Sequence, residues 1–424
     1  MDNRFGILKK YNFWGESKIP VGYLRTEYTD KIYSYSGKNR LIKVLVGQRR
    51  VGKSYILRQL ALRLIENGVD SKNTLFINCE LSEFSFIQTH KDLDDLIKLY
   101  RNELKPQGRI YIFLDEVQNV KEWERAINSY SQDYIDEYEV FISGSNSKML
   151  SGELATLLSG RYICFDIFPF SFNEYVGITG KEHNKQSYEE YMSSGGLPEL
   201  FVLPEPELKR NYISAVKDTV LLRDIIQRYT IRDAKLLEDI FVYLVNNASN
   251  LLSITNITNY LKSSGRKTSY DTVATYIGYI EDTYLVHRAE KYNIRGKETI
   301  AGNCKYYIND LSFNNYLYQG FGYGAGYQLE NLVYLELLRN GFDVYVGSIK
   351  GKEVDFVAIK GDRTIYIQAT LMLIDKQTIE REYSALESIE DNYEKYVVSL
   401  DSTQLFSRGG IRHIQAWNLA EALK

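Results

Sequence analysis

The chain has few residues of the types that build disulfide frameworks or zinc sites. Its 424 residues include three cysteines and four histidines, and both types are scattered along the chain. Scattered cysteines give neither paired half-cystines nor the close spacing of a metal-ligand cluster. We therefore expect a protein of a reducing compartment, the cytoplasm, without disulfides and without a zinc site.

Long hydrophobic runs and a dominant charge are also lacking. No apolar run is long enough to cross a bilayer, and the amino-terminal sequence MDNRFGILKKYNFW lacks the apolar centre and cleavage site of a secretory signal. The formal net charge of −3 gives no general electrostatic affinity for nucleic acid. We expect no membrane association, and any contact with nucleic acid must come from a local surface.

The first half of the sequence contains the alternation of strands and helices that is typical of a parallel sheet. Such alternation indicates an α/β domain with helices on both faces of the sheet. A change of pattern near residue 168 predicts mainly helical structure up to about residue 229. Apolar runs predict strands over 43–46, 74–78, 110–114, 140–143 and 162–167, and amphipathic segments predict helices such as 54–67 and 91–104.

Two further patterns follow in the second half of the chain. Three helices and two strands predict a winged helix-turn-helix, and a helix, three strands, a helix and a strand from residue 326 predict a last α/β domain. The helices of the first pattern are expected over 236–247, 254–261 and 269–283, and its strands over 285–292 and 305–308. We expect four parts: a core over 1–170, a helical lid or linker over 171–232, a winged-helix domain over 233–310 and a C-terminal domain over 311–424.

A glycine-rich loop follows the first predicted strand. The octapeptide GQRRVGKS fits the pattern G-x-x-x-x-G-K-[ST], directly after the apolar run IKVLV and before the helical SYILRQLALRLI. Its glycines allow backbone N–H groups to surround phosphates at the amino end of a helix. We predict an ATP and Mg²⁺ site, in which Lys53 contacts the β- and γ-phosphates and Ser54 binds Mg²⁺. The residues predicted to bind ATP are Gly47, Gln48, Arg49, Arg50, Val51, Gly52, Lys53 and Ser54.

An acidic pair ends the third predicted strand. In RIYIFLDEVQ, the apolar run IYIFL leads into Asp115 and Glu116, at the strand end where ligands of open α/β sheets gather. We predict that Asp115 holds the Mg²⁺ shell, directly or through water. We predict that Glu116 orients and deprotonates the attacking water.

Three more residues are candidates for the same site. Ser145 and Asn146 end the strand of VFISGSNSKML; they either reach the γ-phosphate or the attacking water, or cap the helix that follows. Arg161 is the candidate for an arginine that stabilises γ-phosphate charge, from a neighbouring subunit or within the same chain, and its alternative is a surface salt bridge. An arginine supplied by a neighbour implies self-association through the ATPase core.

The succession of these motifs resembles a known family. KVLVGQRRVGKS, FLDEVQ, ISGSNSKML and SGRYICFDIFPFSFNEY, followed by GGLPEL, DTVLLRDIIQRY and KYYINDLSFNNYL, are similar to archaeal and bacterial AAA-type ATPases of the AAA_14 family, which usually carry a C-terminal DUF4143 region. The resemblance spans almost the whole chain. It implies an AAA+-like P-loop core, a winged-helix middle and a C-terminal α/β fold similar to the PD-(D/E)XK nucleases.

A nuclease of that fold needs carboxylates that hold Mg²⁺ and a lysine near the attacking water. Glu330 and Asp355 match the first two acidic positions of the family. The next strand reads TIYIQATLML, with Gln368 and Thr370 where a carboxylate and the lysine are expected, and Lys376 of the following helix is an open alternative for that lysine. We interpret Glu330, Asp355 and Gln368 as a vestigial nuclease site and expect no cleavage of DNA.

The predicted winged helix offers a surface for double-stranded DNA. Arg266, Lys267, Ser269 and Tyr270 lie around the start of its second helix, in a segment that we take to be locally basic. The alternative for such a module is a packing or lid role. The sequence thus predicts an ATP hydrolase that acts as a nucleotide-dependent switch associated with DNA. An ATP-regulated nuclease and a signalling ATPase with a protein target are the alternatives.

Overall fold

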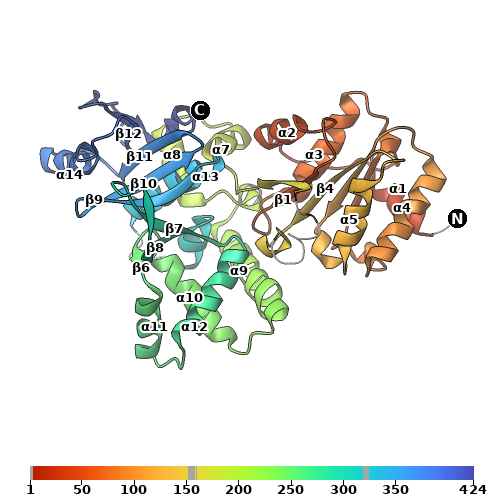
Figure 1. The fold of residues 1–424 in the computed structure, drawn as a ribbon, viewed down its shortest axis with the longest axis horizontal. Helices are drawn as coiled ribbons and strands as arrows, with labels where there is room; N and C mark the ends of the chain where they lie inside the picture. Colours follow the sequence, from red (N-terminus) through yellow and green to blue (C-terminus); the bar gives the residue numbers. More distant parts are fainter. Residues whose placement is uncertain (1–2, 151–157, 159, 319–323) are drawn as a thin grey trace. The chain divides into compact units, whose positions relative to one another are not determined.

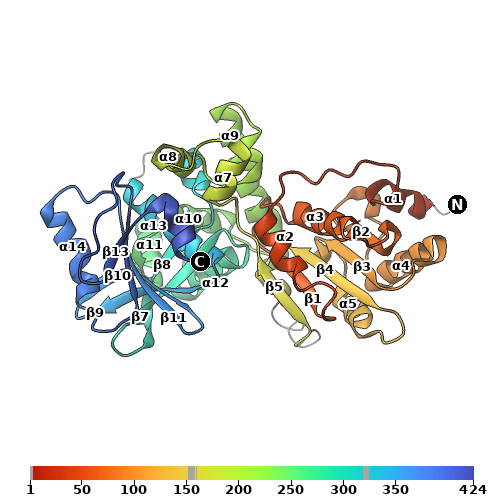
Figure 2. The ribbon, with the colours of Figure 1, turned by 90° about the horizontal axis from the view of Figure 1, so that it is seen from above.

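The computed structural model of the chain describes residues 3–150, 158, 160–318 and 324–424, which fall into two compact units. The first unit comprises Met1–Ile167 and the second comprises Phe168–Lys424. Figures 1 and 2 show the helices and strands of both units in two views. Each unit is built around its own sheet, so each is described by itself.

The first unit contains a parallel sheet in the strand order β2-β3-β4-β1-β5. All neighbouring strands in it run parallel, so their carboxyl ends lie along one edge. Every residue of β1, β3 and β4 is buried, which requires cover on both faces of the sheet. The strands are Ile42–Val46 (β1), Thr74–Asn78 (β2), Ile110–Asp115 (β3), Tyr138–Gly144 (β4) and Tyr162–Asp166 (β5). The helices are Asn3–Tyr11 (α1), Thr26–Tyr33 (α2), Lys53–Glu66 (α3), His90–Leu104 (α4) and Trp123–Gln132 (α5). The predicted α/β fold with a parallel sheet is confirmed.

The second unit begins with helices and ends in a mixed α/β arrangement. Its helices are Phe172–Thr179 (α7), Lys185–Ser194 (α8), Pro206–Thr219 (α9), Ala234–Asn246 (α10), Ile254–Ser263 (α11), Tyr270–Asp282 (α12), Ala325–Arg339 (α13), Lys376–Glu387 (α14) and Leu419–Ala422 (α15). Its strands are Leu251–Leu252 (β6), Val286–Asn293 (β7), Glu298–Ile308 (β8), Asp343–Ile349 (β9), Lys352–Lys360 (β10), Arg363–Thr370 (β11), Glu394–Ser399 (β12) and Ile411–Gln415 (β13). Two π-helical segments, Val220–Gln227 after α9 and Phe313–Leu317 before α13, and two short 3-10 helices, Pro198–Phe201 and Ala416–Asn418, are also present.

One sheet joins the middle of the chain to its carboxyl end. Within the described residues its strand order is β13-β12-β11-β10-β9-β7-β8-β6. The junction is a short parallel pairing between Lys291–Asn293 of β7 and Val346–Ser348 of β9. The sequence predicts a domain boundary between residues 310 and 311, whereas the structure has strands from both sides of it in one sheet. The pairing is long-range and leaves no local pattern that the sequence could reveal.

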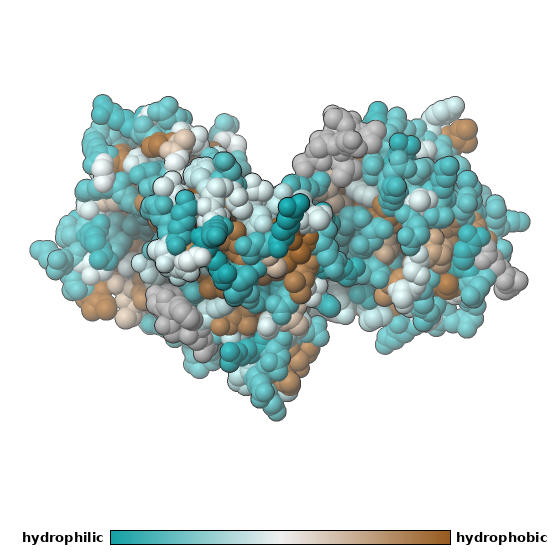
Figure 3. Space-filling model, turned by 90° about the horizontal axis from the view of Figure 1, so that it is seen from below, coloured by the Kyte–Doolittle hydropathy of each residue, from teal (hydrophilic) through white to brown (hydrophobic). Residues whose placement is uncertain are grey.

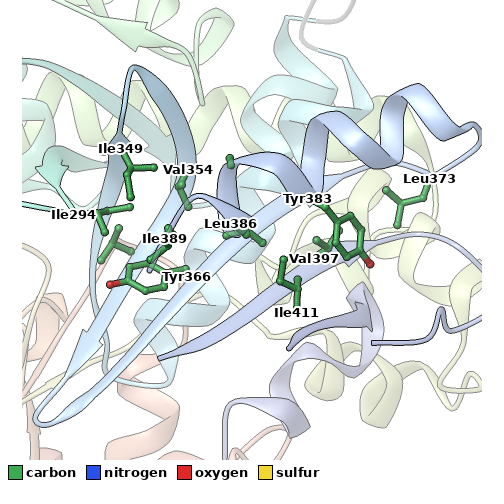
Figure 4. Close-up of a cluster of buried hydrophobic side chains, with 12 residues drawn as sticks. Ile294, Ile349, Val354, Tyr366, Leu373, Tyr383, Leu386, Ile389, Val397 and Ile411 are labelled. Carbon is green, nitrogen blue, oxygen red and sulfur yellow. The ribbon is translucent and has the colours of Figure 1, made fainter. Parts of the chain in front are cut away.

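The C-terminal strands are packed under α14. Figure 4 shows this cluster, in which Tyr366, Leu386, Val397 and Ile411 are buried between the helix and strands β11 to β13. Ile294, which directly follows β7, belongs to the same cluster. The hydrophobic core therefore continues across the β7–β9 junction, as the sheet does.

One face of the molecule carries mostly hydrophilic residues. Figure 3 shows this face, on which hydrophobic residues form small separate patches among hydrophilic ones. Among the described helices, none is both long enough and apolar enough to span a bilayer.

Candidate nucleotide-binding site

The loop between β1 and α3 has a backbone that only glycine adopts easily at two points. Gly47 has φ of 148° and Gly52 has φ of 97°. A Cβ atom added to Gly47 would lie 2.2 Å from the carbonyl oxygen of Ile167, so a larger residue does not fit there. Arg50 adopts a left-handed φ of 69° without being glycine. The fixed glycines of the motif are thus required by this turn.

Lys53 is the first residue of α3 and is buried inside the loop. Its ammonium group donates hydrogen bonds to the carbonyl oxygens of Gly47 and Gln48, both at 2.9 Å. The same nitrogen lies 3.8 Å from Oε1 of Glu116. The backbone N–H groups at the amino end of α3 add the positive end of the helix dipole. The loop therefore gathers positive charge where a phosphate chain would bind.

Asp115 ends β3 and is fully buried next to the loop. Its carboxylate accepts a hydrogen bond from Ser143 Oγ at 2.5 Å, one from Asn78 Nδ2 at 2.9 Å and one from the hydroxyl group of Ser54. Burial, followed by the charge of Glu116, raises the pKa of Asp115 to about 6. A carboxylate beside a serine hydroxyl group is a set of oxygen donors that suits Mg²⁺. The predicted Mg²⁺ ligands Ser54 and Asp115 thus lie together.

Glu116 directly follows β3 in a left-handed conformation, with φ of 51°. Such a backbone is unfavourable for a residue other than glycine and is common at functional sites. Its carboxylate accepts hydrogen bonds from Gln118 Nε2 at 2.5 Å and from Ser145 Oγ at 3.2 Å. Burial opposes ionisation, but the charges of Lys53 and Arg49 outweigh it and hold the pKa of Glu116 below its usual value. Glu116 is therefore an ionised, oriented carboxylate.

Asn146 lies just after β4 and is fully buried. Its neighbour Ser145 contacts Glu116. Its Oδ1 accepts the N–H of Lys148 at 2.8 Å, so the capping alternative is correct for this atom. Its Nδ2 is buried and forms no hydrogen bond with any described residue. A buried donor without a partner costs about 1–3 kcal/mol. This donor is available to an oxygen of a bound ligand, and its contact with the γ-phosphate stays a prediction.

Arg161 lies at the wrong edge of the sheet for a role in its own site. It precedes β5, and its guanidinium donates a hydrogen bond to Asn128 Oδ1 at 2.9 Å on the surface. Because β5 runs parallel to β1, its amino end is opposite the edge that carries the phosphate-binding loop. The alternative in which Arg161 acts within the same chain is therefore wrong. Its action on a neighbouring subunit stays a prediction.

Arg25 supports the loop and was not predicted. It is almost fully buried at the start of α2, and its guanidinium donates to the carbonyl oxygen of Val51 at 2.8 Å. Its backbone N–H donates to Oε1 of Gln59, whose amide group donates to two carbonyl oxygens of the segment before α2. An arginine in the polar sequence RTEYTD is typical of an exposed helix end, so the sequence carries no signal for this burial.

In the second unit, the structure brings together the three residues of the predicted vestigial nuclease site. Asp355 and Gln368 are in direct contact, because the N–H of Asp355 donates to Gln368 Oε1 at 3.3 Å. Lys305 of β8 lies 2.9 Å from Glu330 and 4.0 Å from Asp355. The lysine at these carboxylates is thus Lys305, a residue that the sequence did not single out.

Two of the four residues predicted to contact DNA are engaged within the chain. Arg266 donates to Asp239 Oδ2 at 2.5 Å, and the Ser269 hydroxyl group caps α12. Lys267 and Tyr270 are exposed. The segment 233–310 contains nine Lys and Arg residues and nine Asp and Glu residues. The charges therefore balance over the predicted domain as a whole, whereas residues 262–267 contain three basic residues and no acidic one, and the DNA contact stays a prediction.

Comparison with known families identifies the class of the first unit. Residues 39–176 match the AAA_14 family, an AAA domain. The resemblance to AAA_14 P-loop ATPases is thereby confirmed. Residues 185–323 match DUF8612, a domain of unknown function, rather than the DUF4143 region that the resemblance implied.

Full-length relatives then place the chain in its family. A protein of Haemophilus influenzae is 34% identical over 383 residues, which span 88% of this chain and 92% of the relative. A protein of Methanocaldococcus jannaschii is 31% identical over 363 residues, which span 82% of this chain and 78% of the relative. Both relatives are described as uncharacterized proteins. The chain belongs to the same family as these two proteins, with an AAA_14 domain at its amino end.

Solved structures give more distant similarities. The Aeropyrum pernix Orc1 protein in complex with DNA is 14% identical, with 71% of this chain and 94% of that chain covered and a TM-score of 0.32. The Thermotoga maritima RuvB Holliday junction branch migration motor is 15% identical, with 63% and 90% covered and a TM-score of 0.33.

Proposed function

We propose that the first unit binds ATP with Mg²⁺ and hydrolyses it, and that the chain acts as a nucleotide-dependent switch. The single observation that carries the proposal is the meeting of Lys53, Asp115 and Glu116 at the carboxyl edge of β1 and β3. A cationic loop, a magnesium-type donor set and an ionised base are the three parts that P-loop hydrolysis requires.

Each part has a distinct role in the proposed reaction. The loop N–H groups and Lys53 bind and orient the β- and γ-phosphates. Ser54 and Asp115 hold Mg²⁺, which, when bound, neutralises charge on the phosphate oxygens. Glu116 accepts the proton of the attacking water, and its lowered pKa keeps it ionised for this task.

Two neighbours position the base. Gln118 and Ser145 donate hydrogen bonds to the same oxygen, Oε2, of Glu116. This leaves Oε1, the atom 3.8 Å from Lys53, as the oxygen nearer to the phosphate-binding loop. We therefore assign proton transfer to Oε1.

Binding is tested with Lys53→Ala. We expect loss of ATP binding, measured with a fluorescent ATP analogue, because the loop loses its phosphate-facing cation. Lys91→Ala, on the exposed side of α4, is the matched control and should bind like the unaltered chain. Unchanged ATP affinity of Lys53→Ala would refute the assignment of the loop.

Hydrolysis is tested with Glu116→Gln. The variant should bind ATP and release phosphate about 10²–10⁴-fold more slowly, the usual contribution of a general base. Glu103→Gln changes an exposed carboxylate of the same unit and should leave turnover unaltered. Normal turnover in Glu116→Gln would contradict its role as base while leaving the binding assignment intact.

The DNA association of the switch is a second part of the proposal. The order α10, β6, α11, α12 and the β7–β8 hairpin supports a winged helix, and Lys267 and Tyr270 are exposed around the start of α12. We expect weak duplex DNA binding that falls with salt, measured by anisotropy, and a further loss in Lys267→Ala. Absence of salt-dependent binding with and without ATP would favour a protein target.

A further inference from the structure

Three carboxylates surround one lysine in the second unit. Lys305 comes from β8, Glu330 from α13, and Glu353 and Asp355 from β10. The ammonium nitrogen of Lys305 lies 2.9 Å from Glu330 Oε1, 2.8 Å from Glu353 Oε1 and 4.0 Å from Asp355 Oδ1. These distances place the ammonium group at the centre of the cluster.

The cluster is largely shielded from water. The side chains of Lys305, Glu330 and Asp355 are 5%, 10% and 11% exposed, whereas Glu353 is 36% exposed and forms the open side. Burial alone would lower the pKa of Lys305, but the charges of Glu330, Asp355 and Glu353 outweigh it and raise the pKa. The ammonium group of Lys305 therefore faces three carboxylates in a site that is largely shielded from water.

One carboxylate oxygen each of Glu330, Glu353 and Asp355 is engaged by donors of the protein. Glu330 Oε1 accepts the Tyr307 hydroxyl group at 2.8 Å in addition to Lys305. Asp355 Oδ2 accepts the N–H of Ala369 at 2.8 Å. Gln368 Oε1, in the position of the third ligand of the nucleases, accepts the N–H of Asp355. The residues present do not fit a metal ion as they stand.

We propose that the ammonium group of Lys305 is the resident cation of this cluster and takes the place that a divalent metal ion holds in the PD-(D/E)XK nucleases that the sequence resembles. A monovalent group fixed to the chain neutralises the carboxylates but supplies no open coordination position for water. The cluster is thus a structural ion network, and its acidic residues become a divalent cation site once the lysine charge is removed. This inference does not depend on the proposed ATPase activity.

The test measures Mn²⁺ binding to the full chain by calorimetry, without nucleotide. Asp115→Asn is present throughout to disable the nucleotide site. The chain with Lys305 should have no Mn²⁺ site that depends on Asp355. Lys305→Met, which removes the charge and keeps most of the volume, should gain an Mn²⁺ site that is at least about tenfold tighter than any residual Mn²⁺ binding by the chain with Lys305. Addition of Asp355→Asn should abolish the gained site. Lys350→Met, an exposed lysine of the same unit, is the control and should gain nothing.

The removal of Lys305 leaves buried carboxylates without a counter-charge, so its effect on folding is part of the test. If Lys305→Met melts at a lower temperature, Mn²⁺ should raise its melting temperature again. The melting temperature of the Lys350→Met control should not change with Mn²⁺. A Lys305→Met chain that neither binds Mn²⁺ nor is stabilised by it would overturn the proposal.

Two measurements on the chain with Lys305 intact need no altered lysine. An Mn²⁺ site that disappears in Asp355→Asn would overturn the proposal, because the metal and the lysine would then share the cluster. Cleavage of duplex DNA with Mg²⁺ or Mn²⁺ that disappears in Asp355→Asn would overturn it as well, since Lys305 would then be the lysine of a working nuclease. The absence of both results is expected.

Discussion

Removal of the buried cation Lys43 should destabilise the first unit strongly and in a pH-dependent way. Lys43 of β1 and Glu139 of β4 are both fully buried, with Nζ and Oε1 2.7 Å apart. Glu139 also accepts the N–H of Gly37 at 2.9 Å, and Lys43 donates to Asn39 at 3.1 Å. Lys43→Met keeps much of the volume but leaves Glu139 without its close counter-charge. Breaking a buried pair in this way usually costs about 3–5 kcal/mol.

The loss of free energy of unfolding caused by Lys43→Met has an upper bound that depends on pH. A buried carboxylate without a counter-charge takes up a proton rather than stay charged. Keeping an ordinary glutamate protonated costs about 3.7 kcal/mol at pH 7 and about 1 kcal/mol at pH 5. Arg109, whose nearest nitrogen lies 3.6 Å from Glu139, reduces the cost further. We therefore expect a loss of about 2–4 kcal/mol at pH 7 that shrinks to about 1 kcal/mol at pH 5.

The assay must report on the first unit alone. The chain has three tryptophans, of which Trp14 and Trp123 lie in the first unit and Trp417 lies in the second. Trp417→Phe therefore makes tryptophan fluorescence a probe of the first unit during urea unfolding. Lys43→Met and Lys43→Met/Glu139→Leu are compared in this background, and the double variant should regain most of the lost free energy of unfolding.

Any of three results would refute the reasoning about Lys43. One is a loss at pH 7 that is below about 1 kcal/mol, the range of an exposed ion pair. Another is a loss that stays constant between pH 7 and pH 5, because proton uptake by the buried carboxylate would then not limit the lost free energy of unfolding. A double variant as unstable as the single one would show that packing, rather than charge, causes the effect.

Two further predictions concern assembly and acid stability. If Arg161 acts on a neighbouring subunit, Arg161→Ala and Glu116→Gln should each hydrolyse ATP slowly, and a mixture of the two should recover part of the lost rate; strictly additive rates would exclude shared sites. His413 is buried, and its Nδ1 accepts the N–H of Leu405 at 2.9 Å. Burial lowers the pKa of His413, so below about pH 6.5 the unfolded chain binds a proton that the folded chain does not, and the free energy of unfolding falls as the pH falls. His413→Gln, followed by Trp417 fluorescence, should remove up to about 1.4 kcal/mol per pH unit of this slope; an unaltered slope would contradict the assignment.

Most of the first unit could be predicted because its signals are local. Each predicted strand ends within a residue or two of the observed β1 to β5, since short buried runs between helices are hard to misplace. The phosphate-binding loop and the acidic pair also follow from adjacent residues. Asn78 and Ser143, which donate to Asp115, lie at the ends of strands β2 and β4. The parallel order of the strands would have suggested them.

The alternative in which Arg161 acts within its own chain could have been excluded from the sequence. The sequence predicts parallel strands. In a parallel sheet, a residue that precedes one strand and a residue that follows the neighbouring strand lie at opposite edges of the sheet. Arg161 precedes its strand, whereas Gly47 follows its own. That order alone separates the two by the length of the strands.

In the second unit, the unpredicted features come from long-range contacts. The β7–β9 pairing joins strands that are far apart in sequence, and no local pattern reports it. Lys305 is the first residue of the strand predicted over 305–308, and a charged side chain at a strand end indicates an ordinary exposed position. Only the three-dimensional arrangement shows that this side chain meets Glu330 and Asp355.

Residues of the motif KYYINDLSF form buried contacts with two other segments of the second unit, α13 and the motif GGLPEL. Lys305 and Tyr307 bind Glu330 of α13. Three residues later, Asp310 accepts the N–H of Gly196 at 2.7 Å, within the GGLPEL motif. A Cβ atom added to Gly195 would lie 2.3 Å from the Asp310 carboxylate, so the first glycine of that motif is required by close approach. Both motifs are therefore explained by buried contacts inside the second unit, and neither needs a ligand to account for it. In the nucleotide site of the first unit, by contrast, Asn146 Nδ2 is a buried donor without a partner among the described residues, so a bound ligand would account for it.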